Sequence, residues 1–291
     1  MISIVDPHQH LWDLRNMRLS WLQQEGLEPL RRSFVWEDYL QAVTGWGVVQ
    51  TVYMEVDVDE RDRSIEAETV LRWWREGNPW LGGAVLSVRP ASPELAADLR
   101  RYAAYPVVKG FRQVLHVAQT PPGYCLQTRF MEGVRELGQH GYSFDLCMRP
   151  GEWLDAARLV EACPQTQFII DHCGNMPVQS RDETLRAAWQ QGMKALAGLP
   201  NTVCKISGIV ITAAEPWQPS DLADVIEPTI EWFGEERVMF ASDWPVCTLR
   251  ATFTQWLRAV QHLVASRSES FKRKLFGENA RRVYRLPPVS A

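Results

Sequence analysis

The chain has 291 residues, of which 46% are hydrophobic and 23% charged, and its 31 basic and 35 acidic residues give a net charge of −4. This balance is typical of a globular protein with a sizeable core, and the lack of a basic stripe argues against a nucleic-acid partner. No apolar run approaches the roughly 20 residues that span a bilayer, and the first residues do not resemble a signal peptide. We therefore expect a cytoplasmic protein of one domain (1–291), a monomer or homodimer, that acts on a small molecule without nucleic-acid or membrane partners.

Eight short apolar runs of strand length alternate with amphipathic segments along the chain. They cover residues 2–5, 48–54, 81–88, 107–111, 143–147, 167–170, 202–206 and 237–241. Between them, apolar residues recur at helical spacing, as at Ala67, Val70, Leu71 and Trp74. Eight such units predict an α/β fold, a single (β/α)8 barrel of the TIM type. A doubly wound open sheet is the second choice, because no glycine-rich phosphate loop follows the first run.

Two segments fall outside this repeat. Residues 11–34 show no regular period, and a connection of that length is more often functional than idle, so we expect it to lie over the barrel mouth as a lid. Residues 268–286 have apolar positions at helical spacing and predict one or two short helices that close the barrel.

Two histidines come directly after the first apolar run. Side chains alternate along a strand, so His8 and His10 face the same way, as a divalent metal or a substrate carbonyl would require. In a TIM barrel the chemistry lies at the carboxyl ends of the strands. The ends of the sixth and eighth runs carry His172 and Asp243, which we expect to meet the first pair.

Further polar residues stand at other strand ends. Arg112, after the fourth run, is placed to bind a carboxylate or carbonyl of a substrate, and His116 and Trp244 would help to orient that substrate. Glu55, after the second run, is equally well explained as a substrate-binding residue or as a strand-end charge. Asp171 is better explained as the cap of the following turn.

Other candidates carry less chemistry. Lys109 and Lys205 lie inside strands, so each needs a partner or an exit to solvent, and the sequence assigns neither a role. His140 and His262 are expected to be structural or exposed. Six cysteines are scattered without a CxxC pair, which does not fit a cysteine zinc site.

Six phrases resemble the amidohydrolase superfamily, and more narrowly its lactone-hydrolase branch, which includes sugar lactonases and pyrone-dicarboxylate lactonase. They are residues 6–13 (DPHQHLWD), 108–112 (VKGFR), 144–147 (FDLC), 171–175 (DHCGN), 205–208 (KISG) and 240–245 (FASDWP). The resemblance runs from residue 3 to about residue 285. It implies a barrel whose catalytic or metal-binding groups are the strand-one histidine pair, a later histidine and the aspartate that ends strand eight.

The chain departs from the binuclear members of that superfamily, which use a carboxylated lysine after strand four and a histidine after strand five. Here strand five ends in Cys147-Met148-Arg149, without a histidine, and Lys109 precedes Gly110. The resemblance therefore implies at most one divalent ion, zinc in preference, or activity without a metal. The ligands of such an ion would be His8, His10, His172 and Asp243.

These observations predict a hydrolase that opens a small lactone, such as a sugar-acid lactone. Asp243 would take a proton from water, and the three histidines would stabilise the oxyanion directly or through the metal. One alternative is a metal-dependent decarboxylase or hydratase of the same superfamily that acts on an unsaturated or aromatic acid. Another is a non-catalytic binding protein on a barrel scaffold.

Overall fold

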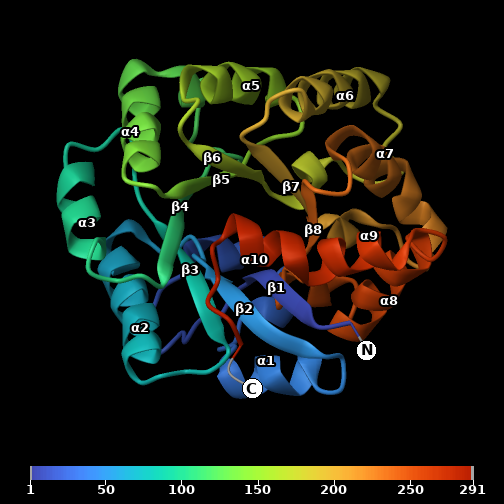
Figure 1. Cartoon of the computed structure of the whole chain (residues 1–291), viewed down its shortest axis with the longest axis horizontal. Helices are drawn as coiled ribbons and strands as arrows, with labels where there is room; N and C mark the ends of the chain where they lie inside the picture. Colours follow the sequence, from blue (N-terminus) through green and yellow to red (C-terminus); the bar gives the residue numbers. More distant parts are fainter. Residues whose placement is uncertain (1, 290–291) are drawn as a thin grey trace.

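The computed structural model describes residues 2–289, which form one sheet of eight parallel strands in the order β1 to β8. A parallel bridge between Gln9 and Trp244 joins the residues that follow the last strand to β1, and helices surround the strands (Figure 1). The (β/α)8 barrel predicted from the sequence is confirmed. The strands are β1 (Ile4–Gln9), β2 (Val48–Met54), β3 (Leu81–Ser87), β4 (Val108–Val114), β5 (Ser143–Cys147), β6 (Gln167–Ile170), β7 (Thr202–Ile206) and β8 (Val238–Phe240). The helices are α1 (Trp36–Val43), α2 (Arg63–Arg75), α3 (Leu95–Tyr102), α4 (Thr128–Gln139), α5 (Trp153–Ala162), α6 (Glu183–Ala197), α7 (Ala223–Phe233) and α8 (Phe253–Leu263).

The strand boundaries differ from the prediction mainly at the carboxyl ends. Strands β2, β5, β6 and β7 begin and end as expected, whereas β3 ends one residue earlier and β8 is shorter at both ends. Strand β1 continues to Gln9 and β4 to Val114, so that His8 and Arg112 lie inside strands and not after them. The prediction was wrong there because polar side chains interrupt the apolar pattern that delimits a buried strand.

The barrel interior has an apolar half and a polar half. Alternate residues of a strand share one face, so Val203 and Lys205 of β7 point inward at successive levels, as do Ile169 and the residue after β6, Asp171. The apolar level lies nearer the amino ends of the strands. It consists of Val5, Val52, Met54, Val85, Ile169, Val203 and Met239, together with Ala280, Val283 and Tyr284 from the end of the chain.

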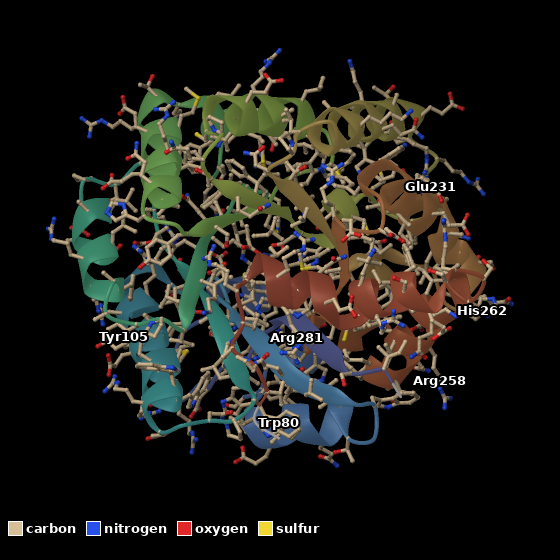
Figure 2. The ribbon with its side chains drawn as sticks, in the orientation of Figure 1. Trp80, Tyr105, Glu231, Arg258, His262 and Arg281 are labelled. Atoms are coloured by element: carbon tan, nitrogen blue, oxygen red, sulfur yellow. The ribbon has the colours of Figure 1, made fainter. Side chains whose placement is uncertain are left out.

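The C-terminal helices close the amino end of the barrel, as predicted. Helix α9 (Glu269–Arg273), a π-helical turn (Lys274–Glu278) and α10 (Asn279–Val283) follow one another across this end (Figure 1). Arg281, labelled in Figure 2, donates from Nη1 to Oε1 of Gln50 in β2 at 3.0 Å. Tyr284 reaches furthest inward, because its hydroxyl donates to Oδ2 of Asp145 in β5 at 2.8 Å.

The long segment after β1 is folded and packed. It contains two short 3-10 helices, Ser20–Gln23 and Glu28–Leu30, and an antiparallel bridge between Trp12 and Phe34 closes it into a loop. Trp21 donates from Nε1 to the carbonyl of Val56 at 2.9 Å, which ties the loop to the residues after β2 at the mouth of the barrel. Its function as a lid stays a prediction.

Among the described residues, no helix combines the length and hydropathy that crossing a bilayer requires. All six cysteines are buried and free, so each packs as a small apolar side chain.

Candidate active site

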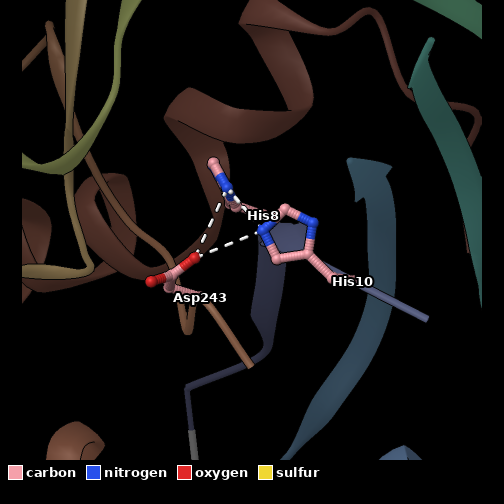
Figure 3. Close-up of side chains that lie close together, drawn as sticks. All are labelled: His8, His10 and Asp243. Carbon is pink, nitrogen blue, oxygen red and sulfur yellow. Dashed lines mark hydrogen bonds and ion pairs between the residues drawn. The ribbon is translucent and has the colours of Figure 1, made fainter. Parts of the chain in front are cut away.

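Three imidazoles surround one carboxylate oxygen at the mouth of the barrel. Oδ1 of Asp243 lies 3.3 Å from Nε2 of His10, 3.6 Å from Nε2 of His8 and 4.0 Å from Nε2 of His172. The Nε2 atoms of His8 and His10 are 3.1 Å apart. Figure 3 shows the two rings beside the carboxylate of Asp243, with dashed lines that join its oxygen to both. The structure thus brings together the four residues that the sequence predicted, from β1 and the ends of β6 and β8.

The backbone around Asp243 holds its carboxylate in this position. Asp243 has a φ of +54°, a left-handed conformation that is uncommon for a residue with a side chain and is typical of functional sites. Its N–H donates to the carbonyl of His8 at 2.9 Å, which fixes the β8 end against β1. The preceding residue, Ser242, donates from both N and Oγ to the buried carboxylate of Asp6, at 2.8 and 2.5 Å.

His172 is positioned by the end of β7. It also has a positive φ, +56°, and its Nδ1 lies 2.9 Å from Oγ of Ser207. The next residue, Gly208, packs against the ring so closely that a Cβ there would lie 2.4 Å from Nδ1. Burial lowers the pKa of His172, whereas Asp243 and Asp171 act in the opposite direction.

Lys205 lies beneath this cluster inside the barrel and is fully buried. Its Nζ is 2.6 Å from Oδ2 of Asp145, 3.0 Å from Oδ1 of Asp171 and 3.0 Å from Nδ1 of His8. Burial lowers the pKa of His8 well below its ordinary value, and the charge of Lys205 adds to the effect, so His8 is neutral. The sequence left Lys205 without a role, and the structure gives it three partners.

Asp171 does not cap the turn that follows it, so that prediction was wrong. Its side chain makes no cap hydrogen bond and is fully buried, accepting from Lys205 and, at 3.1 Å, from Nη1 of Arg112. Burial alone would raise the pKa of Asp171, but Lys205 and His8 outweigh it and hold the pKa well below its ordinary value. Asp171 is therefore a buried anion beside His8.

Arg112 is held by protein groups on two sides. Its Nε donates to Oε1 of Glu55 at 2.6 Å and its Nη2 to the carbonyl of Glu55 at 2.7 Å, while Nη1 reaches Asp171. Glu55 is therefore paired with Arg112 and is not a free charge at the end of the strand. The contacts that we predicted for Arg112 and Glu55 with a substrate stay predictions.

The other predicted residues lie at different depths. His116 lies two residues after β4 with an exposed side chain, and desolvation of its ring by neighbouring residues, together with the charges of Arg112 and His172, lowers its pKa to about 4. Trp244 is only 3% exposed and its ring packs against Phe34 and Tyr39, and its predicted contact with a substrate stays a prediction. His140 and His262 are exposed, and His262 lies on the outer side of α8 (Figure 2).

Asp57 is a carboxylate that the sequence analysis missed. It has a φ of +49°, and its backbone N–H donates to Oε2 of Glu55 at 2.9 Å. Burial, together with the charge of Glu55, raises the pKa of Asp57 to about 6. Its spacing two residues after Glu55, which would put both carboxylates on one side if the strand continued, was the available signal.

Two groups of side chains have the spacing of a metal site. His8, His10 and Asp243 form one, and His8, Asp171 and His172 form the other, with ligand atoms within 4.8 Å of one another in each. His10, His172 and Asp243 could each offer a ligand atom. His8 does not fit that role, because cationic groups flank both of its ring nitrogens: Nζ of Lys205 at 3.0 Å and Nη1 of Arg112 at 3.4 Å.

Comparison with known proteins gives a consistent result along the whole chain. The family model described as Amidohydrolase matches residues 5–286. An L-fucono-1,5-lactonase of Burkholderia multivorans is 27% identical over 293 residues, which cover 97% of this chain and 96% of that protein. An L-rhamnono-gamma-lactonase of Scheffersomyces stipitis is 26% identical, with coverage of 98% and 99%. A crystal structure of an amidohydrolase from Burkholderia multivorans with bound zinc has a TM-score of 0.87 at 25% identity and covers 98% of this chain and 100% of that chain.

Proposed function

Because this chain belongs to the amidohydrolase family, we propose that it is a hydrolase that opens the ester bond of a small, uncharged lactone such as a sugar-acid lactone. The observation that carries the proposal is the carboxylate of Asp243, 3% exposed and surrounded by three imidazoles. The lactonase names of two full-length relatives support the same reaction.

Lactone opening needs a base, donors for the oxyanion and a proton for the leaving alkoxide. Asp243 takes the proton from water, because it is the carboxylate nearest to all three imidazoles. Nδ1 of His10 lies 3.0 Å from the carbonyl of Met54 and must donate to it, so Nε2 of His10 is unprotonated and lies 3.3 Å from Oδ1 of Asp243. The abstracted proton can be shared between these two atoms and then passed to the alkoxide.

The developing oxyanion needs N–H groups directed at it. His172 supplies one when Oγ of Ser207 donates to its Nδ1, which leaves the hydrogen on Nε2. His8 supplies another from Nε2: its hydrogen faces Nε2 of His10 in the resting site and becomes free for the oxyanion when His10 takes up the abstracted proton. No step of this reaction is assigned to a metal ion, because both groups of side chains with the spacing of a metal site include His8, whose surroundings do not fit a metal ligand.

The charges at the mouth favour a neutral ring over a dicarboxylate. A dicarboxylate would need free guanidinium groups, and the three arginines at the ends of β3, β4 and β5 have partners. Arg112 is paired with Glu55 and Asp171, as described above. Arg89 pairs with Glu60 at 2.9 Å, and Arg149 donates to Glu152 and to two backbone carbonyls. By contrast, Asp57 is a half-buried carboxylate of the kind that accepts hydrogen bonds from sugar hydroxyls.

A weakly buffered indicator assay tests this function. The protein is incubated with neutral sugar 1,4- and 1,5-lactones, with a pyrone dicarboxylate and with aromatic acids, and acid release is followed. Lactone opening releases a proton, whereas decarboxylation consumes one, so the sign of the change separates the two reactions. We expect acid release with neutral lactones and none with Asp243→Asn. Proton uptake with an aromatic acid, or a preference for the dicarboxylate, would contradict the proposal.

A further inference from the structure

We propose that Lys205 is a positioning residue that keeps His8 in the tautomer with its hydrogen on Nε2, so that His8 faces the mouth as a hydrogen-bond donor and not as a metal ligand. The statement about the tautomer stands on its own. Only the use of that N–H toward an oxyanion rests on the proposed lactonase function.

The first argument is the donor count of Lys205. An ammonium group has three N–H donors and no acceptor. Nζ has three neighbours within hydrogen-bond distance: Oδ2 of Asp145 at 2.6 Å, Oδ1 of Asp171 at 3.0 Å and Nδ1 of His8 at 3.0 Å. Each donor therefore has one acceptor, and the lone pair of Nδ1 is the third. A neutral imidazole that accepts at Nδ1 carries its hydrogen on Nε2.

The second argument comes from the other side of the ring and does not involve Lys205. Because Nδ1 of His10 donates to the carbonyl of Met54, Nε2 of His10 is a bare lone pair. It lies 3.1 Å from Nε2 of His8, a distance at which one of the two nitrogens must carry a hydrogen or a cation must join them. A hydrogen on Nε2 of His8 satisfies His10 without a further group.

The opposite tautomer has two contacts in its favour, with Asp171 and with Arg112, and two against it. Oδ1 of Asp171 lies 3.3 Å from Nδ1 of His8 and could accept from it. That arrangement would leave the ammonium of Lys205 facing an N–H at 3.0 Å and two bare Nε2 atoms facing each other. Nη1 of Arg112 lies 3.4 Å from Nε2 of His8 and could donate to it in this tautomer. It already donates to Asp171 at 3.1 Å, however, so this contact is weaker than the one between Lys205 and Nδ1 of His8.

The separation of the histidines alone would not exclude a metal. Two ligands of a tetrahedral zinc ion at about 2.0–2.1 Å each are separated by little more than 3 Å, close to the observed spacing of the two Nε2 atoms. Ligating histidines in general donate their second nitrogen to a carboxylate or carbonyl. Here the second nitrogen of His8 faces an ammonium group, which is the reverse of that pattern.

Lys205 is itself fixed from the closed end of the barrel. Oδ2 of Asp145, its nearest partner, also accepts the hydroxyl of Tyr284 at 2.8 Å. Tyr284 and Asp145 are fully buried, so the C-terminal segment is connected to His8 through two fixed side chains. This arrangement leaves the ammonium group little freedom to turn away from Nδ1.

The tautomer can be measured directly in the unaltered protein. Long-range proton–nitrogen correlation spectra of protein labelled with 15N-histidine distinguish Nδ1–H from Nε2–H rings, and His8 is assigned by the signal that His8→Gln removes. We expect an Nε2–H ring for His8 and an Nδ1–H ring for His10. An Nδ1–H ring for His8 in metal-free protein would overturn the proposal. The measurement needs no substrate, so its failure differs from failure of the lactonase assay.

The variant test uses the affinity for zinc chloride, measured by calorimetry. Lys205→Met should free Nδ1 of His8 to donate to Asp171, change the tautomer and raise the zinc affinity about 10-fold or more, the size of effects seen for groups behind metal ligands. Lys109→Met is the matched control, because Lys109 is a strand lysine whose Nζ donates to the carbonyl of Arg285 at the opposite end of the barrel. Equal zinc affinity in unaltered protein, Lys205→Met and Lys109→Met would overturn the proposal.

Discussion

Replacing Gly208 by alanine should show whether the position of His172 matters to the reaction, independently of any loss of stability. Gly208 has a φ of +66° and a ψ of −36°, and the N–H of Ile209 donates to the carbonyl of Ser207 at 2.7 Å across it. This is the γ-turn that L-residues rarely adopt. Alanine there is strained by about 1–3 kcal/mol before any contact is considered.

The contact with the imidazole is the larger perturbation. A Cβ at Gly208 would lie 2.4 Å from Nδ1 and 2.6 Å from Cγ of His172. Since atoms in contact prefer about 3.5 Å, the ring would have to move by roughly 1 Å. A displacement of that size in a catalytic group can reduce the rate by about 10²-fold, so we expect a loss of this order in kcat for lactone hydrolysis.

Gly77→Ala is the matched control. Gly77 also has a positive φ, +73°, but nothing lies within 4 Å of the Cβ that alanine would add, so only backbone strain changes. Indicator-based turnover and urea unfolding are measured for both variants. Both should lose stability, whereas only Gly208→Ala should lose turnover. If Gly208→Ala hydrolysed the lactone at the rate of Gly77→Ala, the position of His172 would not matter to the reaction.

Three further changes probe other parts of the site. Asp243→Asn should lower kcat at least about 100-fold without a comparable loss of stability, and near-normal turnover would remove Asp243 from the role of base. The pKa of Asp57 is raised from 3.8 to about 6, so the folded state binds a proton more tightly than the unfolded state and loses stability as pH rises from about 4 to 6. The free energy of unfolding of Asp57→Asn should therefore be about 1–3 kcal/mol higher than that of the unaltered protein at pH 7.5. Below pH 4 the two proteins should be equally stable, and urea titrations at both pH values measure the difference. Tyr284→Phe removes one hydrogen-bond donor from Asp145 and should lower the free energy of unfolding, measured in urea, by about 2 kcal/mol. The kcat should change little. A large fall in kcat would mean that the C-terminal segment also acts on the reaction.

The fold could be predicted from the sequence because a barrel strand repeats a simple pattern. The eight apolar runs identified every strand, and the rule that chemistry lies at carboxyl ends identified His172 and Asp243 as partners of the β1 histidines. The carboxyl ends of β1 and β4 were predicted too early, because polar residues of the site stand there in place of the apolar residues that define a buried strand.

The support beneath the histidines could not be predicted. Lys205 and Asp145 are 60 residues apart and Tyr284 and Asp145 139 residues apart, and no local spacing indicates that they meet. Their meeting depends on the register of β5 against β7 and on the path of the C-terminal helix. For Arg112, the sequence showed a guanidinium at the mouth but not the carboxylates that neutralise it.

The buried charges around His8 are better explained by orientation than by stability. Moving Lys205, Arg112 and their carboxylate partners out of water is expensive, and such networks often contribute little to the free energy of folding. What these charges do achieve is a fixed pattern of hydrogen-bond donors and acceptors around one neutral imidazole, with the ammonium group of Lys205 at Nδ1. That pattern occupies the lone pair of Nδ1 and keeps the hydrogen on Nε2, where it can stabilise the negative oxygen that forms when water attacks a lactone carbonyl. The contact with Lys205 that makes His8 a poor metal ligand therefore also makes it a donor to an oxyanion.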